Sequence, residues 1–358
     1  MHDFLKNHII TEDMKLIYQS REHWNEFNEK VVYVTGSTGM LASYLIMFLL
    51  YLKKEHNINV DVVAGIRNRE KAYRLFGEYI DSGLVRLYDV DILEPIKVNA
   101  KIDYIIHAAS LASPQYYGRM PVETILPNVI ATYNVLEYAR RNKIYGVLFF
   151  STGDVYGTVL KEDGITESDI GLLNYLDTGG FYAESKRCGE AMCRAYWLEY
   201  GVPAKFVRIS HTYGPNMDWQ HDTRVFSEFV KNIINGEDIV MKSDGSAKRP
   251  FCYITDNITA LFKILLDGNC GEAYNVGNEN TYISIKGLAN KLAGLFPDKE
   301  IKVVTGDRKM QGYAANKEHR RSTMVTGKTR ALGWNPQIDI EEGFKRTIFS
   351  IEQQLKSN

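Results

Sequence analysis

The sequence predicts an α/β fold, in which a doubly wound parallel sheet is followed by a smaller, discontinuous C-terminal domain. One observation is the alternation of short β-branched runs with helix-length segments between residues 31 and 209, as in consecutive βαβ units. Another is the change of pattern after residue 210, where Gly214 and Pro215 interrupt the chain and shorter elements follow. The 358 residues suffice for two coupled domains.

The alternating region gives the order of the elements. Residues 1–29 are expected to form a helical extension and residues 30–210 the sheet domain, with strands at Val31–Val34, Val60–Ala64, Val85–Leu87, Tyr104–His107, Val147–Phe150 and Ala204–Ile209. The helices between them include Met40–Lys53, Val122–Asn142 and Phe181–Tyr200. Residues 211–358 are expected to form mainly the second domain and to return in part to the sheet, with strands at Tyr253–Asp256, Glu272–Val276 and Ile301–Val304.

Composition argues against several classes of function. The net charge is −1, so we expect no nucleic-acid partner. The first residues carry acids and lack the apolar core of a signal peptide, and the run Met40–Leu52 is too short to span a bilayer, so we expect no membrane association. The four cysteines include no Cys-x-x-Cys pair and the eight histidines no ligand pair beside acids. Reduced thiols, a cytoplasmic location and no metal site are therefore expected.

A glycine-rich turn follows the first strand and opens an apolar helix, as in Rossmann-type dinucleotide sites. Gly36 permits the tight turn, and Gly39 lets the backbone approach a pyrophosphate at the helix start. The main chain of Thr38, Met40 and Leu41 is expected to complete this cradle. We therefore predict that the first strand and helix bind NAD or a related dinucleotide.

The end of the second strand leaves the choice of cofactor open. An acid that would bind the adenosine ribose of NAD is absent, and Arg67 stands there instead. Arg67 could pair with a 2′-phosphate, which favours NADP, or stack on the adenine of either cofactor. After the third strand, Asp91 and Ile92 are placed to contact the adenine amino group. NAD is the expected cofactor, with NADP as the alternative.

Tyr182 and Lys186 stand at i and i+4, on one face of a predicted helix. A lysine cation beside a tyrosine lowers the phenol pKa, so that the tyrosine can remove a hydroxyl proton while hydride leaves the same carbon. Thr152 follows the strand Val147–Phe150, at the edge of the sheet where ligands bind, and can bond the reacting oxygen. The pattern predicts a dehydrogenase-type active site.

Together these segments resemble the extended short-chain dehydrogenase/reductases, the NAD-dependent epimerase/dehydratase family that modifies nucleotide sugars. The resemblance extends from about Val31 to Ile348. It is carried by the motifs Thr35-Gly-Ser-Thr-Gly39, His107-Ala-Ala109, Ser151-Thr-Gly-Asp-Val-Tyr-Gly157, Tyr182…Lys186, Arg208-Ile-Ser-His-Thr-Tyr-Gly-Pro215 and Leu332-Gly-Trp334. It implies that Ala108, Ala109 and Lys186 contact the cofactor and that the substrate is a nucleotide sugar.

Within that family the chain is most similar to the UDP-glucuronate decarboxylases. The loop His107–Tyr117 is similar to their substrate-side loop, and the segments 222–229 and 245–251 stand where theirs contact nucleotide and sugar. The resemblance implies that the substrate is held by Ser113, Tyr117, Ser151, His211, Arg224 and Arg249. Helices Val122–Asn142 and Phe181–Tyr200 commonly form a dimer interface in relatives, so a homodimer is expected.

The carboxylate pattern separates the reactions of this family. A 4,6-dehydratase has an adjacent Asp-Glu pair, whereas only Asp154 is present here, so decarboxylation or 4-epimerisation through oxidation at C4 is favoured. The chain also departs from the decarboxylase pattern at Ala183, Ser185 and His211. Dehydration, an NADP-linked carbonyl reductase and a non-catalytic dinucleotide-binding regulator stay open as alternatives.

Overall fold

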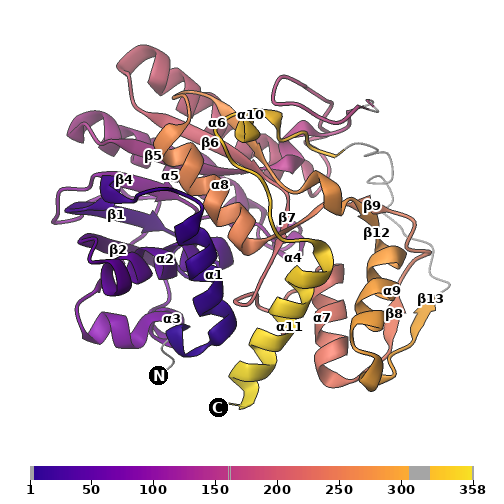
Figure 1. Cartoon of the computed structure of the whole chain (residues 1–358). Helices are drawn as coiled ribbons and strands as arrows, with labels where there is room; N and C mark the ends of the chain where they lie inside the picture. Colours follow the sequence, from indigo (N-terminus) through magenta and orange to yellow (C-terminus); the bar gives the residue numbers. More distant parts are fainter. Residues whose placement is uncertain (1–3, 160, 162, 306–322, 357–358) are drawn as a thin grey trace.

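The computed structural model describes residues 4–159, 161, 163–305 and 323–356, which form a central parallel sheet covered by helices on both faces (Figure 1). The seven sheet strands run in the order β11-β6-β5-β4-β1-β2-β3, and every neighbouring pair is parallel. They are β1 (Lys30–Thr35), β2 (Val60–Ile66), β3 (Val85–Asp89), β4 (Tyr104–His107), β5 (Gly146–Thr152), β6 (Ala204–Ile209) and β11 (Ala273–Val276). This arrangement confirms the predicted doubly wound fold.

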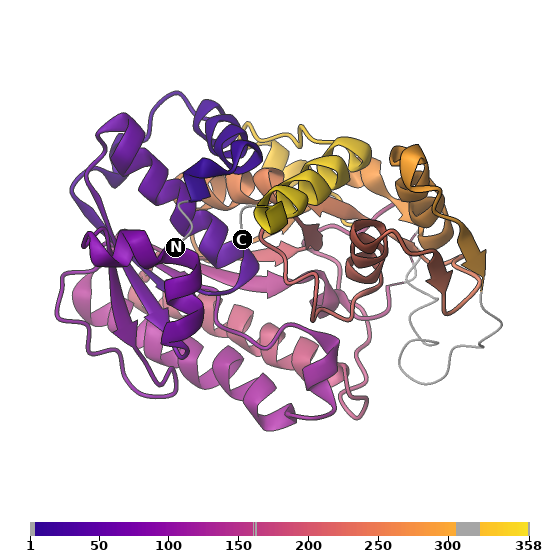
Figure 2. The ribbon, with the colours of Figure 1, turned by 90° about the horizontal axis from the view of Figure 1, so that it is seen from below.

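Two apolar cores lie on opposite faces of the sheet, with helices outside each of them (Figure 2). In β1, Val32 and Val34 belong to one core and Tyr33 to the other, because successive strand residues point to opposite faces. The first core is covered by α2 (Met40–His56), α3 (Arg69–Asp81) and α8 (Ile254–Asp267), and the second by α5 (Pro121–Asn142) and α6 (Gly180–Tyr200).

The part after residue 210 is built from short elements. One of its strands is added to the main sheet, and one of its helices covers a face of that sheet. β11 pairs with β6, and α8 packs against β5, β6 and β11. The other strands are β7 (His211–Tyr213), β8 (Ile239–Met241), β9 (Lys248–Arg249), β10 (Phe251–Tyr253), β12 (Ile283–Ser284) and β13 (Val303–Thr305). The other helices after residue 210 are α7 (Val225–Asn235), α9 (Ile285–Leu295), α10 (Gly327–Arg330) and α11 (Ile340–Lys356). The short helix α4 (Pro114–Tyr117) belongs to the earlier part of the chain, between β4 and α5.

The predicted strand Tyr253–Asp256 is wrong, because the chain leaves β10 at Tyr253 and enters α8 at Ile254. Tyr253 has extended backbone angles and caps the helix, while Asp256 lies in the first helical turn, where a carboxylate is favourable. The β-branched residues at this boundary are typical of strands, and burial of the whole helix beneath the sheet outweighs that local preference.

The N-terminal segment contains α1 (His8–Gln19), whose buried Asp13 joins three other elements. The Asp13 carboxylate accepts hydrogen bonds from Tyr44 of α2 and Tyr253 of β10. It also forms a salt bridge with Arg346 of α11, 2.8 Å from the nearer guanidinium nitrogen. The helix therefore ties the glycine-turn helix to the C-terminal part of the chain. Across the described ranges, no helix combines the length and apolarity that a membrane span requires.

Candidate active site

The first glycine of the turn after β1 packs directly on the loop after β4. Gly36 adopts φ +63°, and a Cβ atom there would lie 2.7 Å from the Ala109 Cα atom. A larger residue would push these two segments apart, so glycine is required. The turn ends at Gly39, the N-cap of α2, which has no side chain to cap the helix. The first amide groups of α2 therefore suit the pyrophosphate of a dinucleotide.

The other predicted residues of this turn lie at the surface of the cradle. Thr38, Met40 and Leu41 are half-buried and Gly39 is exposed. On the opposite side of the turn, Ala108 and Ala109 donate their backbone N–H groups to Thr35 Oγ1, each over 3.2 Å. This pair of bonds joins the ends of β1 and β4, where the turn begins.

Asn216 contacts the first turn of α2 from the C-terminal part of the chain, a contact that sequence analysis missed. Its Nδ2 donates to the Met40 carbonyl at 2.8 Å and to Ser43 Oγ at 2.9 Å. Its Oδ1 is buried and accepts no hydrogen bond from any described residue. The only sequence signal was its position directly after the Gly-Pro pair that ends the Arg208 motif.

The residues predicted for the adenosine end lie beyond the ends of β2 and β3. These strands are in register with Ile66 opposite Asp89, and Arg67 follows β2 as an exposed side chain. Asp91 is also exposed and accepts from the Leu93 N–H at 3.0 Å. The carbonyl of the half-buried Ile92 accepts from Asn134 of α5 at 3.3 Å.

Tyr182 is the third residue of α6 and is buried against α4. Its ring stacks on that of Tyr117, with centroids 4.6 Å apart and planes inclined by 18°. One turn further along α6, Lys186 Nζ donates to the Phe150 carbonyl at 2.6 Å and lies 4.8 Å from the Phe149 ring centroid. The lysine is thus anchored to β5, two residues before Thr152.

Burial lowers the pKa of Lys186 to about 7, because the ammonium ion has lost most of its water. The negative charge of Glu190, one helical turn later, acts in the opposite direction and favours the protonated lysine. Tyr182, Lys186 and Glu190 stand at i, i+4 and i+8, so the sequence held a signal for Glu190 that we did not use. A lysine that titrates near neutrality suits acid–base chemistry at physiological pH.

Ser151, predicted to contact substrate, is held in a buried polar cluster beside this lysine. Its hydroxyl donates to Glu190 Oε1 at 2.5 Å. The other carboxylate oxygen accepts from Arg208 of β6 at 2.7 Å, in an ion pair whose side chains are both largely buried. Ser151 therefore connects β5 to α6, and its hydroxyl is directed into the protein.

Thr152 and Asp154 lie on a tight turn, the 3₁₀ segment Gly153–Tyr156, that directly follows β5. Thr152 Oγ1 accepts from the Asp154 backbone N–H at 3.2 Å. A side chain at Gly153 would meet the Met324 sulfur at 2.9 Å, so the turn is packed against Met324. Both candidate catalytic residues are half-buried on this fixed turn.

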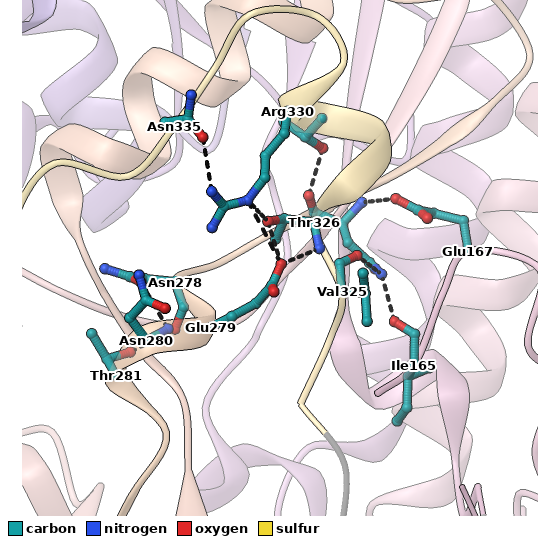
Figure 3. Close-up of polar contacts among 12 residues, drawn as sticks. Ile165, Glu167, Asn278, Glu279, Asn280, Thr281, Val325, Thr326, Arg330 and Asn335 are labelled. Carbon is teal, nitrogen blue, oxygen red and sulfur yellow. Dashed lines mark hydrogen bonds and ion pairs between the residues drawn. The ribbon is translucent and has the colours of Figure 1, made fainter. Parts of the chain in front are cut away.

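Asn275 of β11 holds the same turn by its side chain. Asn275 Oδ1 accepts from the Tyr156 hydroxyl at 2.6 Å, and Nδ2 donates to the carbonyls of Ile165 and Val325, both at 3.0 Å. Figure 3 shows Ile165 and Val325 at this junction. Asn275 is fully buried and its side-chain groups are all used.

The backbone of Asn275 and a neighbouring carboxylate extend this junction. The Asn275 N–H donates to Glu167 Oε1 at 2.7 Å, and its carbonyl accepts from Thr329. Glu279 accepts from both the N–H and the hydroxyl of Thr326, beside Arg330 (Figure 3). The segments 165–167, 275–279 and 325–330, which are distant from one another in sequence, are thus held together beside the turn that carries Asp154. No local pattern predicted this junction.

The remaining predicted substrate residues lie in several elements. Ser113 precedes α4, and its buried hydroxyl has no hydrogen-bond partner among the described residues. His211 is exposed at the start of β7, with its ring 6.0 Å from that of Phe251. Arg224 begins α7 and is paired with Asp222 at 2.6 Å, and Arg249 lies in β9 and donates to the Lys248 carbonyl.

Comparison with known proteins gives a consistent assignment. The profile of the NAD dependent epimerase/dehydratase family matches residues 32–277. The chain is 32% identical over 314 residues to UDP-glucuronic acid decarboxylase 6 of Arabidopsis thaliana, covering 87% of this chain and 86% of that one. It is 28% identical to dTDP-D-glucose 4,6-dehydratase of Mus musculus, covering 89% and 88%.

Solved structures share the fold. UDP-glucuronic acid 4-epimerase from Bacillus cereus, in complex with UDP-glucuronic acid and NAD, superposes with a TM-score of 0.73 at 20% identity, covering 90% of this chain and 99% of that one. The profile match spans the glycine turn, the Tyr182–Lys186 pair and β11. The chain belongs to the NAD-dependent epimerase/dehydratase family of extended short-chain dehydrogenase/reductases.

Proposed function

We propose that this protein modifies a nucleotide sugar by transient oxidation at sugar C4, as a UDP-glucuronate decarboxylase or a 4-epimerase. The observation that carries the proposal is the buried Tyr182–Lys186 pair, with Lys186 anchored to β5 beside Thr152. The similarity to a UDP-glucuronic acid decarboxylase supports the substrate class. NAD, held at the glycine turn, would supply the acceptor for the C4 hydride and the donor for the later reduction of the 4-keto sugar.

Each catalytic residue has a separate task in this proposal. Tyr182 removes the proton of the C4 hydroxyl, and Lys186 stabilises the resulting phenolate. Thr152 orients the reacting oxygen, and Asp154 acts at C5 or on its substituent. Lys186 also contacts the nicotinamide ribose, a role that the family resemblance implies.

Binding is assigned to residues on both sides of the turn. Ser113, Tyr117 and His211 are proposed to contact the sugar, and Arg224 and Arg249 the diphosphate or the sugar. Ser151, predicted from the resemblance to contact substrate, donates its hydroxyl to Glu190, so a substrate contact would require that hydroxyl to leave Glu190. Residues 30–210 would bind the dinucleotide, and residues 211–358 mainly the nucleotide sugar, with β11 and α8 completing the sheet. Residues 1–29 form the N-terminal extension in this division.

A single carboxylate on the catalytic turn favours decarboxylation or epimerisation over dehydration. Oxidation of a uronic acid at C4 gives a β-keto acid, which loses carbon dioxide without a second acid. Epimerisation needs only rotation of the keto sugar before reduction. Dehydration requires one acid for the leaving hydroxyl and another group for the C5 proton, and Asp154 alone stands on this turn.

The deciding experiment incubates the purified protein with NAD or NADP and a panel of UDP-, dTDP-, CDP- and GDP-sugars that includes UDP-glucuronate. Mass spectrometry then identifies the reaction: loss of carbon dioxide indicates a decarboxylase, loss of water a dehydratase, and a new isomer of unchanged mass an epimerase. Replacing Tyr182→Phe should abolish turnover while nucleotide binding persists. Substantial residual turnover would refute the role of Tyr182.

An NADP-linked carbonyl reductase is the second candidate, and Arg67 is the observation that favours it. Its exposed guanidinium follows β2 where an acid would select NAD. Titration of the wild type and Arg67→Ala with NADPH and NADH distinguishes a site that selects NADP from one that binds either cofactor. A loss of about ten-fold or more in NADPH affinity alone would support a bond to the 2′-phosphate.

We also propose a cytoplasmic homodimer joined through α5 and α6. Ala191, Ala195 and Leu198 are exposed on α6, and Leu198 retains 67% of its accessible surface. Apolar side chains in this position suit a helical interface between two copies. Light scattering of the wild type and Leu198→Glu would test it, because a buried glutamate would disfavour the dimer.

A further inference from the structure

An unbroken line of buried hydrogen bonds connects the glycine turn to the catalytic tyrosine. It starts at Thr35, the last residue of β1, and ends at the Tyr182 carbonyl in α6. Every side chain along it is at least nine-tenths buried. The residues are Thr35, His107, Thr132, Asn128, Ser185 and Tyr182.

The direction of the bonds at Thr35 follows from its hydroxyl. Thr35 Oγ1 accepts the N–H groups of Ala108 and Ala109, which occupy its two lone pairs. Its single proton must therefore be donated to His107 Nδ1, 2.8 Å away. His107 Nδ1 is thus an acceptor and carries no proton.

The bonds on the other side of the ring require the same tautomer. Thr132 Oγ1 donates to the Asn128 carbonyl at 2.7 Å, so toward His107 Nε2, 3.1 Å away, it can only accept. His107 Nε2 therefore carries the proton. Two independent sets of partners specify one neutral form of the imidazole.

The line continues to Tyr182 through an amide whose orientation is also fixed. Asn128 Nδ2 faces two acceptors, the Thr124 carbonyl at 3.0 Å and Ser185 Oγ at 2.9 Å. Ser185 Oγ in turn donates to the Tyr182 carbonyl at 2.7 Å. A reversed amide would place its oxygen against the Thr124 carbonyl oxygen, and Ser185 Oγ could meet that amide oxygen only by turning its proton away from the Tyr182 carbonyl.

We propose that neutral His107, as the Nε2–H tautomer, is a positioning residue that holds the cofactor turn in register with Tyr182. The assignment rests on the proposed function only in naming Tyr182 as the reacting group. Through Thr35 the imidazole is bonded to the end of β1, and through Thr132 to α5, which is bonded to α6. No other imidazole form satisfies all these partners.

The charged surroundings of His107 require the same neutral state. The positive charge of Lys186 in α6 opposes a second positive charge on the ring, and the Phe149 ring of β5 lies against the imidazole at a centroid distance of 5.6 Å. Burial is the largest cause that lowers the pKa of His107, to about 3. A protonated imidazole would also direct a second N–H at the Thr35 hydroxyl, whose proton would have to turn away.

The tautomer can be measured without any substrate. Long-range proton–nitrogen spectra of protein labelled with ¹⁵N-histidine, with and without NAD, distinguish the neutral forms from imidazolium, and His107→Gln assigns the signal. We expect the Nε2–H form throughout pH 6–8 in both states. An Nδ1–H tautomer or an imidazolium signal at pH 7 would overturn the proposal.

A matched pair of substitutions in α5 tests the positioning role. Thr132→Val and Thr124→Val remove equally buried hydroxyls, each of which donates to a carbonyl four residues earlier at 2.7 Å. Only Thr132→Val removes the hydroxyl that lies 3.1 Å from His107 Nε2, whereas the Pro127 carbonyl, another hydrogen-bond partner of the ring, remains in both variants. We expect a changed His107 signal, NAD affinity several-fold weaker and kcat at least about ten-fold lower than in Thr124→Val, with KM for the sugar similar in the two variants.

The outcomes separate this proposal from the proposed function. If the two variants share the same His107 signal, NAD affinity and kcat, His107 does not position the site. If the wild type converts no nucleotide sugar, the proposed function fails, and the tautomer and NAD affinity still decide the inference. Equal melting temperatures of the two variants would show that any difference does not come from unfolding.

Discussion

The ring of Tyr182 lies against the ring of Tyr117 in a stacked arrangement, with 4.6 Å between centroids. Tyr117 ends α4, which follows β4 and the loop beside the glycine turn, and its hydroxyl donates to the Ala112 carbonyl. The candidate catalytic tyrosine is therefore supported from the side of the predicted substrate loop. This stacked contact favours the observed orientation of the Tyr182 ring.

Substitution of Tyr117 should separate ring support from hydroxyl contact. Tyr117→Phe retains the stacked ring, so we expect kcat within about three-fold of wild type and a stability loss of about 1 kcal/mol from the lost hydrogen bond. Tyr117→Ala leaves a cavity beside Tyr182 and should cost about 3–5 kcal/mol in unfolding free energy, with a larger loss of kcat. Equal kcat values for the two variants would contradict the supporting role.

The buried Glu190–Arg208 pair should be far more costly to break than a neighbouring surface pair. Glu190→Gln leaves the Arg208 guanidinium buried without a counter-charge, which should reduce the unfolding free energy by about 3–5 kcal/mol. Glu184→Gln, also on α6, breaks a partly exposed pair with Arg187 and should cost less than about 1 kcal/mol. Urea unfolding of both variants tests this; similar losses would contradict it.

Stability should decrease on acidification because native His107 resists protonation. Its pKa is lowered to about 3 by burial, whereas the unfolded chain protonates near pH 6.5. Between these values the unfolded state binds more protons, so stability is complete above about pH 6.5 and is lost progressively as pH falls. His107 should contribute a loss of about 2 kcal/mol between pH 6.5 and 5.

The contribution of His107 is isolated by comparing variants. Urea unfolding at pH 7.5 and pH 5 should show a smaller acid-induced loss in His107→Gln than in wild type, by about 2 kcal/mol. His8→Gln, which changes an exposed histidine of α1, should retain the wild-type difference. An unchanged difference in His107→Gln would mean that the native imidazole is protonated at pH 5.

The bond between Tyr156 and Asn275 should couple the turn Gly153–Tyr156 to β11. A double-mutant cycle with Tyr156→Phe and Asn275→Ala should give a coupling of about 1 kcal/mol in unfolding free energy, the worth of one buried hydrogen bond. Asn275→Ala alone should cost more than Tyr156→Phe, because it also removes the Nδ2 bonds to the Ile165 and Val325 carbonyls. The Ile165 carbonyl would then keep only its bond from the Val325 N–H. Additive losses would show that the two side chains act independently.

Local patterns were sufficient for the main sheet and for the helix that carries Tyr182 and Lys186. The β-branched runs and their alternation with helix-length segments located all seven strands of the main sheet, and the i, i+4 spacing placed Tyr182 and Lys186 on one helix face. The sequence analysis gave no ranges for α3 or for the short α4, and it described the helices after residue 210 only as short elements, without ranges. In α8 the β-branched start resembles a strand, and only burial against β5 and β6 makes the helix the stable choice.

The sequence by itself determined the parallel α/β fold, the glycine turn and the pairing of tyrosine with lysine, because each depends on neighbours within a few residues. The tertiary structure alone decided the partners of the buried polar groups. Asp13 meets Arg346 across 333 residues, and Tyr156 meets Asn275 across 119. A buried donor must find an acceptor wherever the folded chain brings one, and no local spacing encodes which distant residue that will be.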